Sequence, residues 1–270
     1  CAEKRVSNKE RKPVIGDENR LRALICIDDT DNIDIKRGTG QLASELAGQI
    51  TEHGWGDCEP VTRHQLFVHP DVPYTSHNSA MCFAADVKPQ HLEDIIKYSG
   101  EFLERERAVG SDPGLCVVIP ERLTNPGWLI AYGFSAKQEV LNKDYAYSLA
   151  AELGIHLSEH GGTGDGVVGA LAGTGLRLSG NDGRFRGKFT IALPGQALTV
   201  TDIYAKTYIT KVRSIEDGHI LKDHELVELG EKVKAVLIDQ EAVLLVFPLS
   251  NPGDRGARWR SCTKEELRVY

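Results

Sequence analysis

The sequence predicts a mixed α/β fold of the α+β type, in which a ferredoxin-like module is followed by a small β-rich C-terminal region. Residues 21–27 form a continuous apolar run rich in β-branched residues, which is typical of a buried strand. Residues 90–107 carry apolar side chains at helical intervals, as in an amphipathic helix that covers a sheet. Strand, helix and strand beside an antiparallel neighbour are typical of a ferredoxin-like module, although other α+β folds fit the same pattern.

The remaining elements follow from the same periodicities. The segment 1–20 is polar and lacks apolar periodicity, so we expect a flexible lead-in. The expected helices are 40–53, 90–107, 128–141, 143–153 and an apolar helix after residue 166. The expected strands are 21–28, 61–69, 79–87, 116–120, 155–158, 198–213, 235–238 and 242–247. These patterns divide the chain into a lead-in at 1–20, a main region at 21–182 and a β-rich module at 183–270.

Composition narrows the class of protein. The chain has 270 residues, enough for one large domain or two ordinary ones. Its 39 acidic and 32 basic residues give a net charge of −7, so nucleic-acid binding would need a local basic patch. No apolar run is long enough to cross a membrane and no cysteines form a C-x-x-C pair, so we expect a cytoplasmic protein with reduced thiols.

Three carboxylates follow the first strand within four positions, at Asp28, Asp29 and Asp31, with Thr30 between them. Carboxylates this close raise one another's pKa unless a cation lies between them, and oxygen donors suit Mg²⁺, the usual companion of nucleotide phosphates. The alternative is an acidic turn in which Asp28 or Asp31 caps the next helix. The position at the carboxyl end of a strand favours a binding site, because open α/β sheets bind ligands there.

Two glycine-containing turns precede helices and predict anion sites. Gly38 and Thr39 open the helix at 40–53. A second turn, at 161–166, places four glycines in six positions before an apolar helix, and free backbone amides there would form a phosphate cradle. A tight turn without a ligand is the alternative. The loop lacks the Gly-Lys-Ser/Thr of a Walker motif, and its G-x-G-x-x-G match lacks the acidic residue of a dinucleotide site.

Other polar residues are weaker candidates. A proline-containing loop is bracketed by Arg63, Tyr74, His77 and Asn78. The histidines lack zinc-site spacing, so we expect them at the surface or in contact with substrate. Basic residues around Trp259 suggest either stacking and pairing with nucleic acid or a solvated charged end.

Four of these motifs, in this order, give the chain a resemblance to the archaeal isoleucine-tRNA 2-agmatinylcytidine synthetase family. The first is the strand ending in Asp-Asp-Thr-Asp at 28–31, and the second is the Arg-containing strand with its Pro-Tyr loop at 63–78. The third is Asn-Pro-Gly at 125–127, and the last is the glycine stretch at 162–172. The resemblance covers about residues 21–180 and is specific because the four motifs keep their order.

The resemblance implies a kinase-like domain with a ferredoxin-like domain and an enzyme that uses ATP to attach agmatine to a tRNA cytidine. It implies that the three aspartates bind Mg²⁺ and the triphosphate, and that Thr39 is the counterpart of a threonine that is phosphorylated during the reaction. The family's Cys-Thr-Thr is missing here. Its four-cysteine zinc ribbon cannot form either, because only Cys262 lies beyond residue 116.

We therefore expect an Mg-ATP-dependent enzyme that phosphorylates or activates an acceptor, a tRNA cytidine or a small molecule, for attack by an amine. The alternatives are a non-catalytic nucleotide-binding regulatory protein and an RNA-binding accessory protein. The expected catalytic residues are Asp28, Asp29, Asp31, Thr39 and Arg63. The expected nucleotide-binding residues are Thr30, Gly38, Gly162, Thr163, Gly164, Asp165 and Gly166. The expected substrate-binding residues are Tyr74, His77, Asn78 and Asn125.

Overall fold

The computed structural model describes residues 20–31, 37–70, 78–187, 189, 191–268 and 270. The fold is mixed α/β, as predicted from the sequence. Within the described residues, thirteen strands form one sheet in which most neighbouring strands are antiparallel. The ferredoxin-like arrangement of its first part stays a prediction.

The elements occur in the following bounds. The helices are α1 (Thr39–Glu52), α2 (Leu92–Glu106), α3 (Pro126–Ser135), α4 (Lys143–Leu153), α5 (Gly166–Ser179) and α6 (Val200–Lys206). The strands up to residue 159 are β1 (Leu21–Asp28), β2 (Gly56–Cys58), β3 (Thr62–Gln65), β4 (Ser79–Val87), β5 (Gly114–Val118) and β6 (His156–Glu159). The later strands are β7 (Arg184–Phe185), β8 (Ala197–Thr199), β9 (Lys211–Ser214), β10 (Leu226–Glu228), β11 (Val236–Ile238), β12 (Glu241–Pro248) and β13 (Trp259–Ser261).

Strand β1 is buried on both faces, which is why its sequence is continuously apolar rather than alternating. Ala23, Ile25 and Ile27 point into one core cluster, and Leu24 and Cys26 point into a second cluster on the opposite face. The strand lies between β4 and β5 and is antiparallel to both. Its carboxyl end therefore emerges from the middle of a covered sheet.

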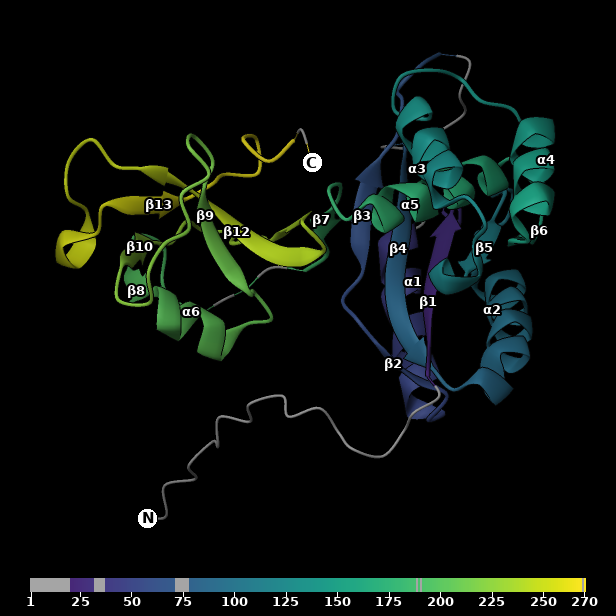
Figure 1. Ribbon diagram of the computed structural model, residues 1–270, viewed down its shortest axis with the longest axis horizontal. Helices are drawn as coiled ribbons and strands as arrows, with labels where there is room; N and C mark the ends of the chain where they lie inside the picture. The colour runs from purple at the N-terminus through teal and green to yellow at the C-terminus, as the bar shows by residue number, and fades with distance from the viewer. Residues whose placement is uncertain (1–19, 32–36, 71–77, 188, 190, 269) are drawn as a thin grey trace.

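Helices cover both faces of this part of the sheet (Figure 1). Apolar side chains of α1 and α2 form the first cluster with β1 and β4, and those of α3, α4 and α5 form the second. Helix α5 approaches the strands closely, since a β-carbon on Gly173 would come within 2.6 Å of the Cys26 sulfur. The first turns of α1 and α5 both lie near the end of β1.

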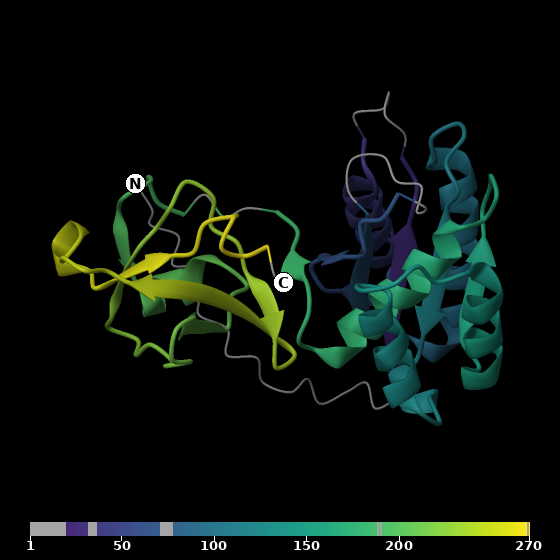
Figure 2. The same ribbon diagram turned by 90° about the horizontal axis from the view of Figure 1, so that it is seen from above.

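The C-terminal strands continue the same sheet through β7. Thr62 and Arg63 of β3 pair with β7, and Arg184 of β7 pairs with Val236 of β11. Beyond this junction β8–β13 and α6 lie to one side of the helix-covered part in both views (Figures 1 and 2). They enclose core clusters of their own, and the division of the chain at 182/183 stays a prediction.

Several local predictions differ from the structure. The segment 198–213 was expected to be strand but contains α6, because Thr199 caps a short helix by accepting a hydrogen bond from the Asp202 amide. Strand β3 ends at Gln65 rather than at residue 69, and α3 ends at Ser135 rather than at 141. The neighbours of β1 are antiparallel, so the rule for open parallel sheets does not explain the site at its end. Among the residues that the structure describes, no helix is both long enough and apolar enough to cross a membrane.

Candidate active site

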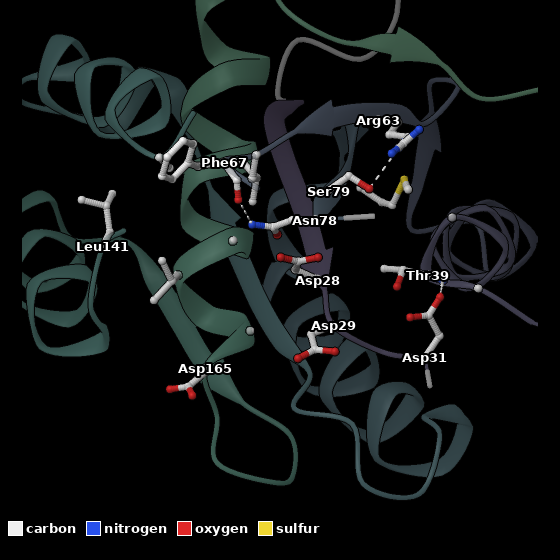
Figure 3. A pocket seen from close by; sticks show the side chains of 18 of the residues that line it. Asp28, Asp29, Asp31, Thr39, Arg63, Phe67, Asn78, Ser79, Leu141 and Asp165 are labelled. Carbon is white, nitrogen blue, oxygen red and sulfur yellow. Dashed lines mark hydrogen bonds between the residues drawn. The ribbon is translucent and has the colours of Figure 1, made fainter. Parts of the chain in front are cut away.

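A cavity of about 480 Å³ opens at the carboxyl end of β1. Its walls come from the first turns of α1 and α5, from the edge of β3 and β4, and from residues 136–143 between α3 and α4. Figure 3 shows these side chains around the end of the strand. The volume falls in the range of small-molecule sites, which are commonly about 300–1,000 Å³.

The aspartates predicted from the sequence lie on the wall of this cavity. Asp28 is the last residue of β1, and Asp29 turns the chain with a positive φ of 50°. Burial and the charge of Asp29 raise the pKa of Asp28 to about 7. Burial and the charges of Asp112, Asp31 and Asp165 raise the pKa of Asp29 to about 6. Negative charge is therefore concentrated here without enough neutralising cations.

Asp31 faces the start of α1 rather than its two neighbours (Figure 3). The backbone amide of Thr39 donates to Asp31 Oδ2 at 3.4 Å. The Thr39 hydroxyl receives a hydrogen bond from the Thr30 hydroxyl at 3.0 Å and is almost buried. Thr39 nevertheless lines the cavity, together with Gly38 and Gly40. The first turn of α1 is thus one wall of the site, with an aspartate beside its amides.

Glycines let α5 contact the end of β1 directly. A β-carbon on Gly166 would meet the backbone of Asp112 and Gly114, at 2.2 and 2.7 Å. One turn later, a β-carbon on Gly169 would come within 1.7 Å of Asp28 Oδ2. Any larger residue at these positions would push α5 away from the strand or displace the Asp28 carboxylate.

Three cations lie on the walls of the same cavity. Arg63 donates to Ser79 Oγ and to Gln65 Oε1, both at 3.0 Å, and has no carboxylate partner among the described residues. Arg186 lies against Gly40 at the start of α1, where a β-carbon on Gly40 would meet its Nε at 2.4 Å. Lys143 donates to the Thr163 carbonyl at 2.6 Å and contacts Glu159 at 3.3 Å. A polyanion in this cavity would have positive charge on several sides.

The opposite side of the cavity is apolar. The lining residues there are Leu66, Phe67, Ala136, Val140, Leu141 and Val168. Asn78 holds this wall in place, because its side-chain amide donates to the Phe67 carbonyl at 2.6 Å. The cavity therefore combines a charged end and an apolar end, as sites for nucleotides and similar ligands do.

A preformed metal site is not present in the part of the chain that the structure describes: no three His, Cys, Asp or Glu side chains converge there. The set of three aspartate ligands stays a prediction: all three line the cavity, and Asp31 also accepts a hydrogen bond from the Thr39 amide. The donor chemistry still fits Mg²⁺, which usually takes one or two carboxylates and completes its shell with phosphate oxygens and water. Asp28 and Asp29 are the pair that such an ion would neutralise.

Much of the predicted nucleotide-binding set lies off the cavity. Asp165 and Gly166 line it, but Gly162, Thr163 and Gly164 do not. The Thr163 amide donates to Asp112, and the Gly166 amide donates to the Asp112 carbonyl at 3.0 Å. The Thr163 and Gly166 amides are thus already hydrogen-bonded, and a phosphate cradle at this loop stays a prediction.

Of the other predicted contact residues, some line the cavity and some do not. Thr30 is 1% exposed and supports Thr39 from behind, so it does not reach the cavity. Asn125 precedes α3 and lies outside the lining, whereas Asn78 and Arg63 belong to it. Tyr74 and His77 lie outside the described residues.

One histidine contradicts the expectation that histidines contact solvent or substrate. His64 is fully buried, with Nδ1 2.9 Å from Asp182 Oδ1 and Nε2 2.8 Å from the Thr62 hydroxyl. Asp182 also pairs with Lys137. The alternation of β3 could have indicated this, since Thr62 and His64 share one face and Arg63 the other.

Sequence patterns did not predict that Gln41, Asn142, Lys143 and the apolar wall line the cavity. Lys143 follows Asn142, whose side chain caps α4 by accepting from the Tyr145 amide. The capping pattern at Asn142 can be recognised in the sequence. The sequence does not show that the start of α4 lines the same cavity as the end of β1.

Comparison with known proteins gives structural matches alone. No protein-family model matches the sequence, and no curated protein matches it at a significant level. A crystal structure of TiaS in complex with an isoleucine tRNA and ATP is 25% identical, with a TM-score of 0.49, over 57% of this chain and 36% of that chain. A tRNA fluorescent labeling enzyme is 26% identical, also with a TM-score of 0.49, over the same shares. Apo TiaS, described as a tRNA agmatidine synthetase, is 24% identical with a TM-score of 0.47, over 57% of this chain and 35% of that chain.

This chain thus spans about a third of the length of the structures it matches.

Proposed function

We propose that the protein is an Mg-ATP-dependent enzyme that activates an RNA acceptor, a cytidine of tRNA by the resemblance of its motif series, for attack by an amine. The observation that carries this proposal is the cavity in which Asp28 and Asp29 face the first turn of α1 with Arg63 and Arg186. The raised pKa values of both aspartates support it, because a bound divalent ion would relieve that repulsion.

Charge distribution suggests how a nucleotide would lie. Its triphosphate would occupy the end near α1, where Arg63 and Arg186 supply positive charge. Its base would contact the apolar wall that includes Phe67 and Leu141. When bound, Mg²⁺ would neutralise phosphate oxygens opposite the two aspartates.

The chain's own residues would contribute positioning and charge, which account for most of the catalysis of phosphoryl transfer. Arg63 is held by Ser79 and Gln65, so its guanidinium is fixed before substrate binds. The Thr39 hydroxyl lies on the cavity wall and is our candidate phosphate acceptor. In that step the Thr39 hydroxyl would lose its proton to solvent and its oxygen would bond to the γ-phosphorus, the bond from that phosphorus to the bridging oxygen would break, and ADP would leave.

The test is incubation of the pure protein with Mg²⁺ and γ-labelled ATP, with and without tRNA, followed by analysis for ADP, AMP and labelled protein. Asp28→Asn should abolish nucleotide turnover. Asp57→Asn is the matched control, because Asp57 is exposed and pairs with Arg20 away from the cavity lining. Equal turnover in Asp28→Asn and the unmodified protein would refute the proposed site, and ATP binding without any turnover would favour a regulatory nucleotide-binding protein.

A further inference from the structure

Six cations gather where β3, β7 and β11 meet, and we call this group the basic seam. Its members are Arg63, Arg184, Arg186, Lys234, Lys264 and Arg268. Among the residues that the structure describes, none of the six forms an ion pair with a carboxylate. Elsewhere such pairing is common, as for Arg22 with Glu59, Arg37 with Glu45 and Arg177 with Glu59.

The strand register forces like charges together. Arg63 of β3 and Arg184 of β7 are direct cross-strand partners, and like charges in that position destabilise a sheet. Arg186 lies two residues beyond Arg184 and so on the same face, while Phe185 between them packs into the core. On the other side Arg184 pairs with Val236, and Lys234 precedes Val236 by two residues.

The end of the chain adds two more cations. Cys262 and Leu267 pack with Val236 in one core cluster, which holds the turn carrying Lys264 and Arg268 against β11. In both views the C-terminal end lies beside β7, at the junction of the two parts of the sheet (Figures 1 and 2). The seam is thus assembled from segments far apart in sequence.

Arg184 shows that the charge is not simply solvated. Only 7% of this residue is exposed, although its guanidinium nitrogens are not fully cut off from solvent. Burial and the charge of Arg268 lower its pKa, and burial and the charge of Arg184 lower those of Arg63 and Lys234. Like charges crowded at one junction repel one another, and a bound anion would relieve that repulsion.

We propose that the basic seam binds the phosphodiester backbone of an RNA strand that runs from the candidate active site along β7 toward the C-terminal end. Arg63 and Arg186 also line the cavity, so one nucleotide could engage these two. Arg184, Lys234, Lys264 and Arg268 do not line it, and only a longer polyanion would reach them. Arginine forks match phosphate oxygens well, and with a net charge of −7 the attraction for RNA must come from a local basic surface such as this one.

The direction of the strand toward the cavity rests on the proposed function, whereas binding of RNA by the seam does not. The two can therefore fail separately. Loss of ATP turnover in Asp28→Asn with RNA affinity unchanged would leave the seam intact, and RNA binding without any ATP turnover would refute the enzyme alone.

The experiment is fluorescence anisotropy with a labelled single-stranded RNA of mixed sequence, without ATP, over a range of salt concentrations. The test variant is Lys264→Gln with Arg268→Gln, both exposed, and the control is Lys97→Gln with Lys206→Gln, which removes the same charge from other surfaces. Each lost phosphate contact should reduce the slope of log K against log salt by about 0.7. We expect a slope smaller by about 1.4 and an affinity lower by about five- to tenfold in the test variant, with no change in the control.

Arg184→Gln should weaken binding further, and its circular dichroism and thermal unfolding establish whether it folds. If that variant does not fold, the exposed pair still decides the question. Equal weakening in test and control variants, or binding that does not depend on salt, would overturn the proposal. So would displacement of RNA by ATP or inorganic tripolyphosphate at equal phosphate concentration, or equal binding of poly-glutamate.

Discussion

Gly169 in α5 lies so close to Asp28 that a β-carbon on this glycine would be 1.7 Å from Asp28 Oδ2. The carboxylate fits in its place in the cavity only because residue 169 is a glycine, which has a hydrogen where other residues have a β-carbon. The contact between Gly169 and Asp28 therefore sets both how closely α5 packs on the sheet and where this proposed catalytic carboxylate lies.

Gly169→Ala should displace the Asp28 carboxylate and lower ATP turnover by at least about tenfold, since small misplacements at an active site carry large costs. Gly48→Ala is the matched control, because Gly48 lies in α1 with open space around it. The control should keep full turnover and gain up to about 1 kcal/mol of stability from helix propensity. Turnover and urea unfolding of both variants check this, and full turnover in Gly169→Ala would contradict the assignment of Asp28.

The metal-free protein should lose stability as pH rises. Burial and Asp29 raise the pKa of Asp28 to about 7, well above the unfolded value of about 3.9. The folded state thus favours the protonated carboxyl of Asp28. The stability that this protonation contributes is fully present below about pH 4 and is lost as pH rises through about 7. In EDTA, Asp28→Asn should raise the free energy of unfolding at pH 8 by on the order of 2–4 kcal/mol.

Urea unfolding of the unmodified protein and Asp28→Asn at several pH values between about 5 and 8 measures this effect. Asp57→Asn, at an exposed ion pair, should leave the pH dependence unchanged. Added Mg²⁺ with ATP should remove the advantage of Asp28→Asn. A variant less stable than the unmodified protein at the upper end of this range would show that Asp28 is not a destabilising charge.

Thr39 should be the residue that becomes labelled from γ-labelled ATP. Thr39→Val should abolish labelling of the protein, because the hydroxyl on the cavity wall is gone. Thr30→Val removes the donor behind Thr39 and should reduce labelling without abolishing it. Peptide mapping by mass spectrometry identifies the labelled position, and label on any other residue would exclude this role for Thr39.

Asp182 should be important for stability rather than for turnover. Its pKa is lowered because hydrogen bonds and charges from His64 and Lys137 outweigh burial, which alone would raise it. The ionised Asp182 carboxylate therefore stabilises the folded state above about pH 4, and this stabilisation is lost as pH falls further. Asp182→Asn leaves Lys137 uncompensated and should cost about 3 kcal/mol.

Asp239→Asn provides the comparison, since Asp239 is exposed and its contact with Arg213 is 3.4 Å. That change should cost no more than about 0.5 kcal/mol. Thermal and urea unfolding of both variants measure the difference. Similar costs would mean that the buried cluster around Asp182 is already weakly paired.

Local patterns in the sequence predicted several elements well. Strand β1 was located because an apolar run ends abruptly at Asp28, and β4 was located at its observed bounds. Helix α6 was missed because the pattern of 198–213 is rich in β-branched residues, while Thr199 and Asp202 form a local cap that starts a helix. The hydrogen-bonded cap formed by Thr199 and Asp202 outweighs the intrinsic preference of the β-branched residues for strand.

The site was predicted in part for a related reason. Asp28, Asp29 and Asp31 are adjacent in sequence, so their proximity needed no knowledge of the fold. Arg186 comes to the start of α1 only through pairing of β3 with β7, and no local pattern contains that information. At the glycine loop, the sequence shows backbone freedom but not that Asp112 accepts from the Thr163 amide.

Strand β7 consists of only Arg184 and Phe185, yet it is hydrogen-bonded to β3 on one side and to β11 on the other. A fragment truncated before residue 183 would expose the bare edge of β3, whose unpaired amides and carbonyls invite association with other strands. Preparations of the first part alone should therefore be prone to self-association, so studies of its chemistry are better done on the intact chain.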